Sequence, residues 1–150
     1  MKKLLNNRRI NSAGFTLLEL LIVIAIAAIL IAVASASYST AQRKARDAKR
    51  MGDMKAIQNA AEQYYSDNSA AYPPSTADFG SYLPAGFPND PKCPGGTCAS
   101  GYNNYVYTPG GTTYFSCAQL ESLVGNATGI NGTGFGSTST GQYYCAKNLQ

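Results

Sequence analysis

The chain has no histidine and no tryptophan among its 150 residues, and only 13% of its side chains are charged. Histidine is the commonest general base and the commonest metal ligand, so its absence disfavours acid–base catalysis and histidine-ligated metal centres. The sequence also contains no nucleophile motif, no phosphate-binding loop and no convincing pair of catalytic carboxylates. These absences predict that the protein is not an enzyme.

Proline is missing from the long stretch between Phe15 and Ser66, which contains a single glycine, Gly52. Because proline breaks helices and glycine weakens them, the stretch predicts one continuous helix, roughly 78 Å long at about 1.5 Å per residue. A helix of this length is unusual in a small globular domain and is typical of a membrane span or a packed assembly.

Charged side chains are almost absent from the first part of this helix, where Glu19 is the only one between Leu17 and Ala36. As a helix this run spans roughly 30 Å, which matches the hydrocarbon core of a bilayer. A carboxylate costs about 2.5–3.5 kcal/mol in such a segment, so it usually has a partner and a function. The run therefore predicts a transmembrane helix in which Glu19 is either paired or solvated at the level of the lipid headgroups.

Nearby side chains do not supply a partner for Glu19, because the next cation downstream is Arg43. Cleavage of the chain before Phe15 would create an amino group four residues before Glu19. This amine, in the same subunit or in a neighbouring one, is the natural partner for the carboxylate.

The excess positive charge lies in the N-terminal leader. The formal net charge is +4, and it is carried by Lys2, Lys3, Arg8 and Arg9. After Gly14, eight basic side chains balance eight acidic ones. The basic balance of the whole chain therefore does not indicate a nucleic-acid partner.

The segment Gly14-Phe15-Thr16-Leu17-Leu18-Glu19, preceded by a basic leader and followed by a long apolar helix, resembles the class III prepilin signal. That signal is found in type IV pilins and in the pseudopilins of type II secretion. The resemblance implies cleavage by a prepilin peptidase between Gly14 and Phe15, and methylation of Phe15. It also implies that Glu19 pairs with the terminal amine of an adjacent subunit during assembly.

One residue departs from the family pattern. Many relatives carry a helix-breaking proline at the position that Ala36 occupies here, so a locally melted helix is less securely implied. An ordinary secretory signal is the alternative, since Ala34-Ser35-Ala36 fits its A-x-A cleavage site and would release a soluble domain starting at Ser37. Glu19 and the unbroken helical pattern weigh against it.

The second half of the helix is predicted to have two faces. One consists of small residues and would admit a neighbouring helix: Ala41, Ala45, Ala48 and Gly52. The other would cover a sheet: Met54, Ile57, Ala61, Tyr64 and Tyr65. Cations also line this half, namely Arg43, Lys44, Arg46, Lys49, Arg50 and Lys55.

These cations are interpreted as a solvated helix face, with Arg43–Asp47 and Lys49–Asp53 as i, i+4 pairs. Contact with lipid headgroups or DNA is the alternative interpretation. Six cations follow the span and four precede it, so a plain count places the C-terminal side in the cytoplasm. The cysteines and the leader indicate export instead.

Four cysteines lie beyond the apolar helix, at Cys93, Cys98, Cys117 and Cys145. An even number on the far side of a membrane segment indicates two disulfides in an oxidising compartment. Of the three possible connectivities we favour Cys93–Cys98, which brackets a tight turn, and Cys117–Cys145. A four-cysteine zinc site is the alternative, although the spacings lack the paired C-x-x-C pattern. The resemblance also allows calcium near the C-terminus, but no acidic set matches such a loop clearly, so no cofactor is predicted.

Proline and glycine divide the rest of the chain. Tyr72-Pro73-Pro74 ends the helix, and the residues Gln63–Asn68 followed by Tyr72-Pro73 again resemble major pseudopilins and related pilins. A short helix is expected near 77–83, and Pro109-Gly110-Gly111 joins two predicted strands. Further expectations are strands at 102–108, 112–117 and 142–147, a short helix at 118–124 and an exposed glycine-rich loop at 125–141 with acceptor triplets at Asn126 and Asn131.

Together these features predict an α+β fold in which a long N-terminal membrane-spanning helix carries a small antiparallel sheet on its outer half. The expected segments are a cleaved leader at 1–14, a transmembrane and filament-core helix at 15–36, its amphipathic continuation at 37–68 and a disulfide-stapled domain at 69–150.

The expected function is that of a structural filament subunit, with a preference for a type II secretion pseudopilin. The resemblance implies three partners: other copies of the chain, the prepilin peptidase and the inner-membrane assembly platform. The protein would cross the bacterial inner membrane once, with its C-terminal domain outside the cytoplasm, and then enter a filament in the periplasm or at the cell surface. A minor pilin for DNA uptake or adhesion is the alternative, but Lys92 and Lys147 are the only cations beyond Lys55.

Overall fold

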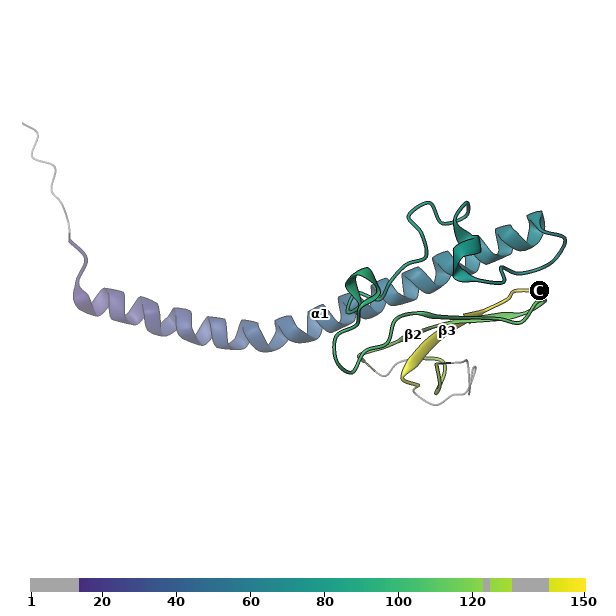
Figure 1. Ribbon diagram of the computed structural model, residues 1–150. Helices are drawn as coiled ribbons and strands as arrows, with labels where there is room; N and C mark the ends of the chain where they lie inside the picture. Colours follow the sequence, from purple (N-terminus) through teal and green to yellow (C-terminus); the bar gives the residue numbers. More distant parts are fainter. Residues whose placement is uncertain (1–13, 123–124, 131–140) are drawn as a thin grey trace, which may run out of the picture. The chain divides into compact units, whose positions relative to one another are not determined.

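The computed structural model describes residues 14–122, 125–130 and 141–150, apart from the side chain of Ala36. The chain divides into two compact units, Met1–Ser39 and Thr40–Gln150. It has the predicted α+β fold, with one long N-terminal helix and a small antiparallel sheet (Figure 1). Most of the leader and much of the glycine-rich loop, including Asn131, lie outside the described residues.

Helix α1 runs from Leu17 to Asp67. Its end lies where the sequence predicts it, shortly before Pro73. The Asn68 side chain donates to the Tyr64 carbonyl at 2.9 Å, and the amide of Ala70 donates to the Tyr65 carbonyl at 3.2 Å. Ser69 and Ala70 adopt positive φ angles of 54° and 61°, which turn the chain away from the helix axis.

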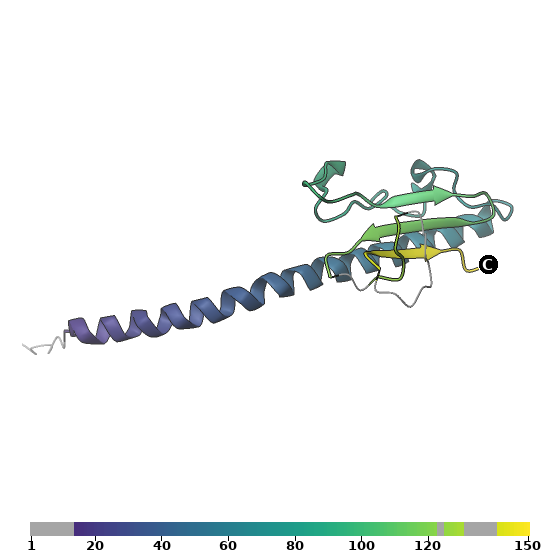
Figure 2. The same cartoon turned by 90° about the horizontal axis from the view of Figure 1, so that it is seen from below.

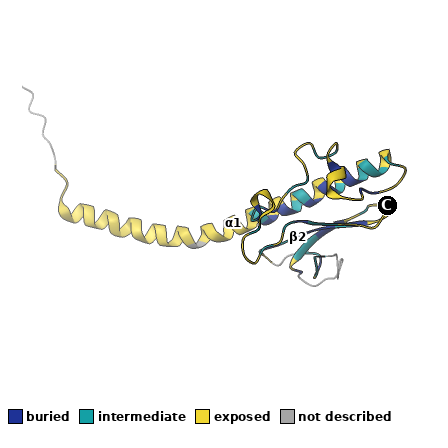
Figure 3. Ribbon diagram, in the orientation of Figure 1, coloured by how far each residue is buried: buried dark blue, intermediate teal, exposed yellow. Residues whose placement is uncertain are grey.

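In the first unit the apolar side chains of α1 are exposed from Leu17 to Val33 (Figure 3). This is the one helix among the described residues that is long and apolar enough to cross a membrane, judged by length and composition alone. A signal sequence near an N-terminus would meet the same criteria, so the finding establishes a candidate span.

In the second unit three strands form an antiparallel sheet in the order β1-β2-β3 (Figure 2). Their bounds are Val106–Pro109, Tyr114–Gln119 and Tyr143–Lys147. The predicted turn connects β1 to β2, and its Gly111 has a φ of +75° that disfavours other residues. The first strand is predicted at 102–108, whereas β1 begins later, at Val106.

The core of this unit lies between the sheet and the C-terminal half of α1. Helix residues Met54, Ile57 and Ala61 are fully buried there. Alternate residues of β2 face them, and Ser116 Oγ lies 3.4 Å from Met54 Sδ. Aromatic rings fill the remaining space, with Phe79 and Tyr107 packed edge to face at 5.0 Å. Tyr107 of β1 and Tyr105, which precedes this strand, therefore belong to the core.

The prediction of a short helix at 118–124 is wrong for its first residues, because β2 continues to Gln119. Ala118 is buried and pairs with Tyr144 of β3, so tertiary burial overrides its helix propensity. Residues 123–124 lie outside the described part of the chain. Two short 3-10 helices complete the unit, Thr76–Phe79 and Pro94–Gly96.

Candidate functional site

The segment with the predicted cleavage site leads directly into α1. Gly14 and Phe15 precede the helix, and the Phe15 side chain is 81% exposed. An exposed, non-helical segment is the conformation that a peptidase can reach. Gly14 and Phe15 are therefore accessible in the structure. Cleavage between them and methylation of Phe15 stay predictions.

Thr16 forms the N-cap of α1. Its Oγ1 accepts a hydrogen bond from the amide of Glu19 at 3.2 Å. The sequence Thr16-Leu17-Leu18-Glu19 has the spacing of a capping box, and substitution of such a cap by alanine costs about 1 kcal/mol. Sequence reasoning missed this role for Thr16, although the T-x-x-E spacing was a usable signal.

Glu19 therefore lies in the first turn of α1, where the helix dipole favours a negative charge. Its side chain is exposed, and the neighbouring side chains Leu17, Leu18 and Leu20 are apolar and exposed. No ion pair to Glu19 is present among the described residues. The pairing of this carboxylate with an amine stays a prediction.

A second polar site lies in the C-terminal unit, where Arg50 is completely buried. Its guanidinium donates to both oxygens of Asp90, Nε–Oδ2 at 2.6 Å and Nη2–Oδ1 at 2.9 Å. Nη1 donates to Asp47 and to Glu121, each at 2.8 Å. One arginine thus joins the helix, the loop before β1 and the segment after β2.

Two further contacts complete this ion cluster. Arg46 donates to both carboxylate oxygens of Glu121, at 2.7 and 2.6 Å. Asp47 accepts from the amides of Glu121 and Ser122, each at 3.0 Å. We refer to Arg46, Asp47, Arg50, Asp90 and Glu121 as the ion cluster.

The contacts within the ion cluster favour the charged forms of Glu121, Arg50 and Asp47. The hydrogen bonds from Arg46, and secondarily from Arg50, outweigh burial and lower the pKa of Glu121 to about 2. Burial acts against the charge of Arg50, but its three carboxylate partners outweigh it and raise the pKa of Arg50. Burial likewise opposes ionisation of Asp47, and its hydrogen bonds still lower the pKa of Asp47.

This arrangement corrects the interpretation of the helix cations as one solvated face. Arg50 and Asp47 are buried, and Asp47 pairs with Arg50 rather than with Arg43. Asp53 accepts from the hydroxyl of Tyr105 at 2.7 Å and forms no ion pair with Lys49. The interpretation holds for the four cations that are exposed, which are Arg43, Lys44, Lys49 and Lys55.

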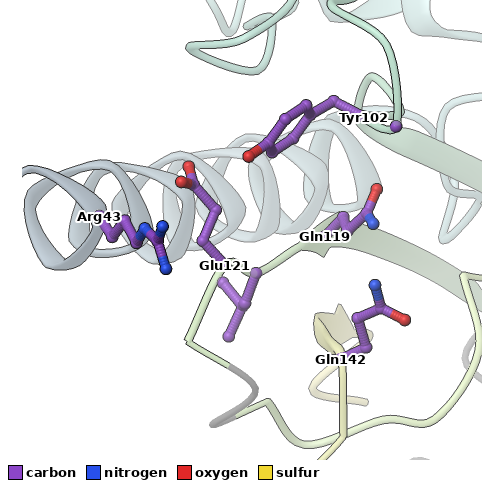
Figure 4. Close-up of a pocket in the computed structure, with 7 residues that line it drawn as sticks. Arg43, Tyr102, Gln119, Glu121 and Gln142 are labelled. Carbon is purple, nitrogen blue, oxygen red and sulfur yellow. The ribbon is translucent and has the colours of Figure 1, made fainter. Parts of the chain in front are cut away.

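A cavity of about 360 Å³ lies beside the ion cluster (Figure 4). Arg43, Tyr102, Gln119 and Gln142 line it together with Glu121. Glu121 is committed to Arg46 and Arg50, and Gln119 accepts from the amide of Asn103 at 3.2 Å. The lining offers hydrogen bonds but no activated nucleophile.

The structure contains the disulfides Cys93–Cys98 and Cys117–Cys145, the pairing that the sequence analysis favoured. Cys117 and Cys145 are directly opposed on β2 and β3. Their face of the sheet is turned away from α1 and is covered by Ala127 and Ile130.

Asn126 covers the outer edge of β3. Its side chain accepts from the amide of Cys145 at 2.7 Å and donates to the carbonyl of the same residue at 2.9 Å. The acceptor nitrogen for glycosylation is therefore engaged in the fold. Pairing of the backbone of Ala127 with Tyr143 extends this cover.

No group of three or more cysteine, aspartate or glutamate side chains within residues 14–122, 125–130 and 141–150 is arranged to hold a metal ion. That the protein binds no cofactor, with calcium as the alternative, stays a prediction.

Comparison with known proteins identifies one feature of the chain. The family model for the prokaryotic N-terminal methylation motif matches residues 9–35. No curated protein and no solved structure matches the chain. The matched residues contain the cap Thr16, the acid Glu19 and the exposed apolar part of α1.

Proposed function

We propose that the chain, which carries the prokaryotic N-terminal methylation motif over residues 9–35, is a prepilin-peptidase substrate and a structural subunit of a pilus-like filament. Cleavage between Gly14 and Phe15 releases the leader, and the new N-terminal residue is methylated. The processed chain then polymerises through the apolar part of α1.

The observation that carries this proposal is the position of Glu19. It lies in the first turn of α1, directly after the cleavage segment, and the large apolar side chains of this helix from Leu17 to Val33 are exposed. An amine created at Phe15 is within reach of a carboxylate four residues later in the same or an adjacent copy. Such a pair satisfies both charges in lipid.

Pairing between copies also selects one register. An intramembrane charge without a partner costs at least about 2.5 kcal/mol, so displaced arrangements that leave Glu19 and an amine unpaired are penalised. The exposed apolar side chains from Leu17 to Val33 provide contact area in every register, and the single acid distinguishes among them. Glu19 thus specifies alignment more than affinity.

The segments of the C-terminal unit are held together by ion pairs and disulfides. The ion cluster joins three segments, and two disulfides close loops in the remainder. Within the family we favour a type II secretion pseudopilin, because the helix ends in Tyr64-Tyr65-Ser66-Asp67-Asn68 and carries a small tyrosine-rich sheet. Its expected partners are the peptidase, the assembly platform and other copies.

The decisive experiment determines the N-terminus of the protein by mass spectrometry in the native host. We expect a methylated Phe15 on material that also forms filaments in electron micrographs. A chain that starts at Ser37 would establish a secreted soluble domain instead, and a chain that retains residues 1–14 would refute processing.

Glu19→Ala tests the register, with Thr16→Val as a matched variant that removes the cap but keeps the acid. Loss of filaments in Glu19→Ala, with processing retained, supports the proposal. Normal filaments from Glu19→Ala would exclude Glu19 as the assembly residue.

A further inference from the structure

Arg43 is an exposed cation at the cavity of about 360 Å³ beside the ion cluster (Figure 4). It forms no ion pair among the described residues. The acid of the same cavity, Glu121, is already neutralised, because its oxygens accept from Arg46 at 2.7 and 2.6 Å and from Arg50 at 2.8 Å. The cavity therefore offers one guanidinium to a negatively charged group from outside the chain.

The other polar groups of the cavity lining are neutral. The side-chain oxygen of Gln119 accepts from the backbone amide and the side-chain amide of Asn103, each at 3.2 Å, which leaves the NH2 group of Gln119 to donate. Gln142 adds a second side-chain amide from the segment before β3, and Tyr102 adds a hydroxyl group. One guanidinium among neutral hydrogen-bonding groups suits an anion with several oxygens that also carries hydroxyl groups.

Arg43 also follows closely after the candidate membrane span. Seven residues of α1, about 10 Å of helix, separate it from Ala36, and five separate it from Tyr38. Tyr38 is exposed, and tyrosine is enriched where a membrane meets water. The headgroups add about 5–8 Å to each side of the hydrocarbon core, and helical side chains lean toward the N-terminus of their helix. An arginine at position 43 is therefore within reach of lipid phosphates.

We propose that this cavity binds the headgroup of an anionic phospholipid that carries free hydroxyl groups, with phosphatidylglycerol as the type. The guanidinium of Arg43 pairs with the phosphodiester, and the headgroup hydroxyls form hydrogen bonds with Gln119, Gln142 and Tyr102. A volume of about 360 Å³ is at the small end for ligand pockets, so it admits a headgroup while the acyl chains stay in the bilayer.

The same chemistry predicts selectivity among lipids. A phosphocholine headgroup would place a second cation beside Arg43 and has no hydroxyl group for the amides. Phosphatidylserine has the net charge of phosphatidylglycerol, but its ammonium finds no unpaired acid in the described lining, since Glu121 is occupied. The inference goes beyond the filament function and rests on one part of it, the insertion of α1 in a bilayer.

Amide NMR of the full chain in micelles of a phosphocholine detergent tests the site. Short-chain phosphatidylglycerol is added, with short-chain phosphatidylserine and inorganic phosphate as separate arms. We expect shifts at Arg43, Gln119 and Gln142 that saturate with phosphatidylglycerol and need at least fivefold more phosphatidylserine. Equal responses to the two lipids would reduce the effect to surface charge and overturn the inference. Saturation by inorganic phosphate at the same concentration would overturn it in favour of a site for soluble anions.

Matched variants separate the cavity from its surroundings. Arg43→Gln should weaken phosphatidylglycerol binding at least fivefold, because one cation near a membrane surface contributes about that much. Lys49→Gln removes an exposed cation that does not line the cavity and should change binding less than twofold. Equal effects of these two variants would refute the site.

Gln142→Ala tests the hydroxyl contacts and should reduce the preference for phosphatidylglycerol over phosphatidylserine; an unchanged preference would refute the headgroup assignment. The filament function is assessed separately. Loss of lipid selectivity in a chain that still forms filaments overturns this inference alone. A chain recovered in the soluble fraction when phosphatidylglycerol vesicles are floated overturns it together with the proposed membrane span.

Discussion

We expect the C-terminal unit to be sensitive to substitution of Arg50. It is fully buried and makes four charged hydrogen bonds to three carboxylates. Arg50→Met keeps much of its volume but removes its charge, and Asp90 is left buried with no cation. Removal of one partner from a buried ion pair costs about 3–5 kcal/mol. A domain of this size has a total stability of roughly 5–15 kcal/mol, so we expect a loss of about a fifth or more of that stability.

Urea unfolding of the full chain in detergent, followed by the near-ultraviolet circular dichroism of its tyrosines, measures this loss. Lys49→Met is the control, because Lys49 is an exposed cation on the same helix and its loss should change stability by less than about 0.5 kcal/mol. Arg50→Met combined with Asp90→Asn removes the isolated carboxylate and should recover part of the loss. If the free energy of unfolding of Arg50→Met lies within about 1 kcal/mol of that of the parent, the ion cluster does not hold the unit together.

Three further predictions concern the same unit. The pKa of Glu121 in the folded protein is about 2, below its ordinary value. Its contribution of roughly 2–3 kcal/mol to the free energy of unfolding is therefore present above about pH 5 and is lost as the pH falls toward 2. Glu121→Gln should flatten this part of a curve of stability against pH. Replacement of Cys117 and Cys145 by alanine should cost about 3 kcal/mol in thermal unfolding, and reductant should then have a smaller effect than on the parent. Asn126→Asp places a carboxylate against the Cys145 carbonyl and should destabilise more than Asn126→Ala, and equal unfolding temperatures would argue against the edge contact.

The sequence predicted those elements of the fold that depend on residues close together in the chain. The absence of proline predicted α1, and Pro73 predicted its end. The turn Pro109-Gly110-Gly111 predicted the hairpin. Thr16 shows a local signal that was overlooked, since the capping spacing to Glu19 is visible in the sequence.

Long-range contacts explain what the sequence could not reveal. Arg50 meets Asp90 and Glu121, which lie 40 and 71 residues further along the chain. An i, i+4 rule considers only neighbours on the helix, so it assigned Asp47 to Arg43 and left Arg50 in solvent. The misassigned helix after Cys117 has the same cause, because the pairing of Ala118 with Tyr144 depends on a strand that comes much later.

The ion cluster also bears on the excess of cations after the apolar run. Counted as a topology signal, six cations after the run and four before it place the C-terminal unit in the cytoplasm. Two of the six, Arg46 and Arg50, have a separate reason to be there, because the folded unit needs them as partners for Asp90 and Glu121. The disulfides favour the opposite side, since such bonds persist in oxidising compartments. We therefore expect the unit to fold after export, with Arg50 buried in its interior and Arg46 half-buried beside it.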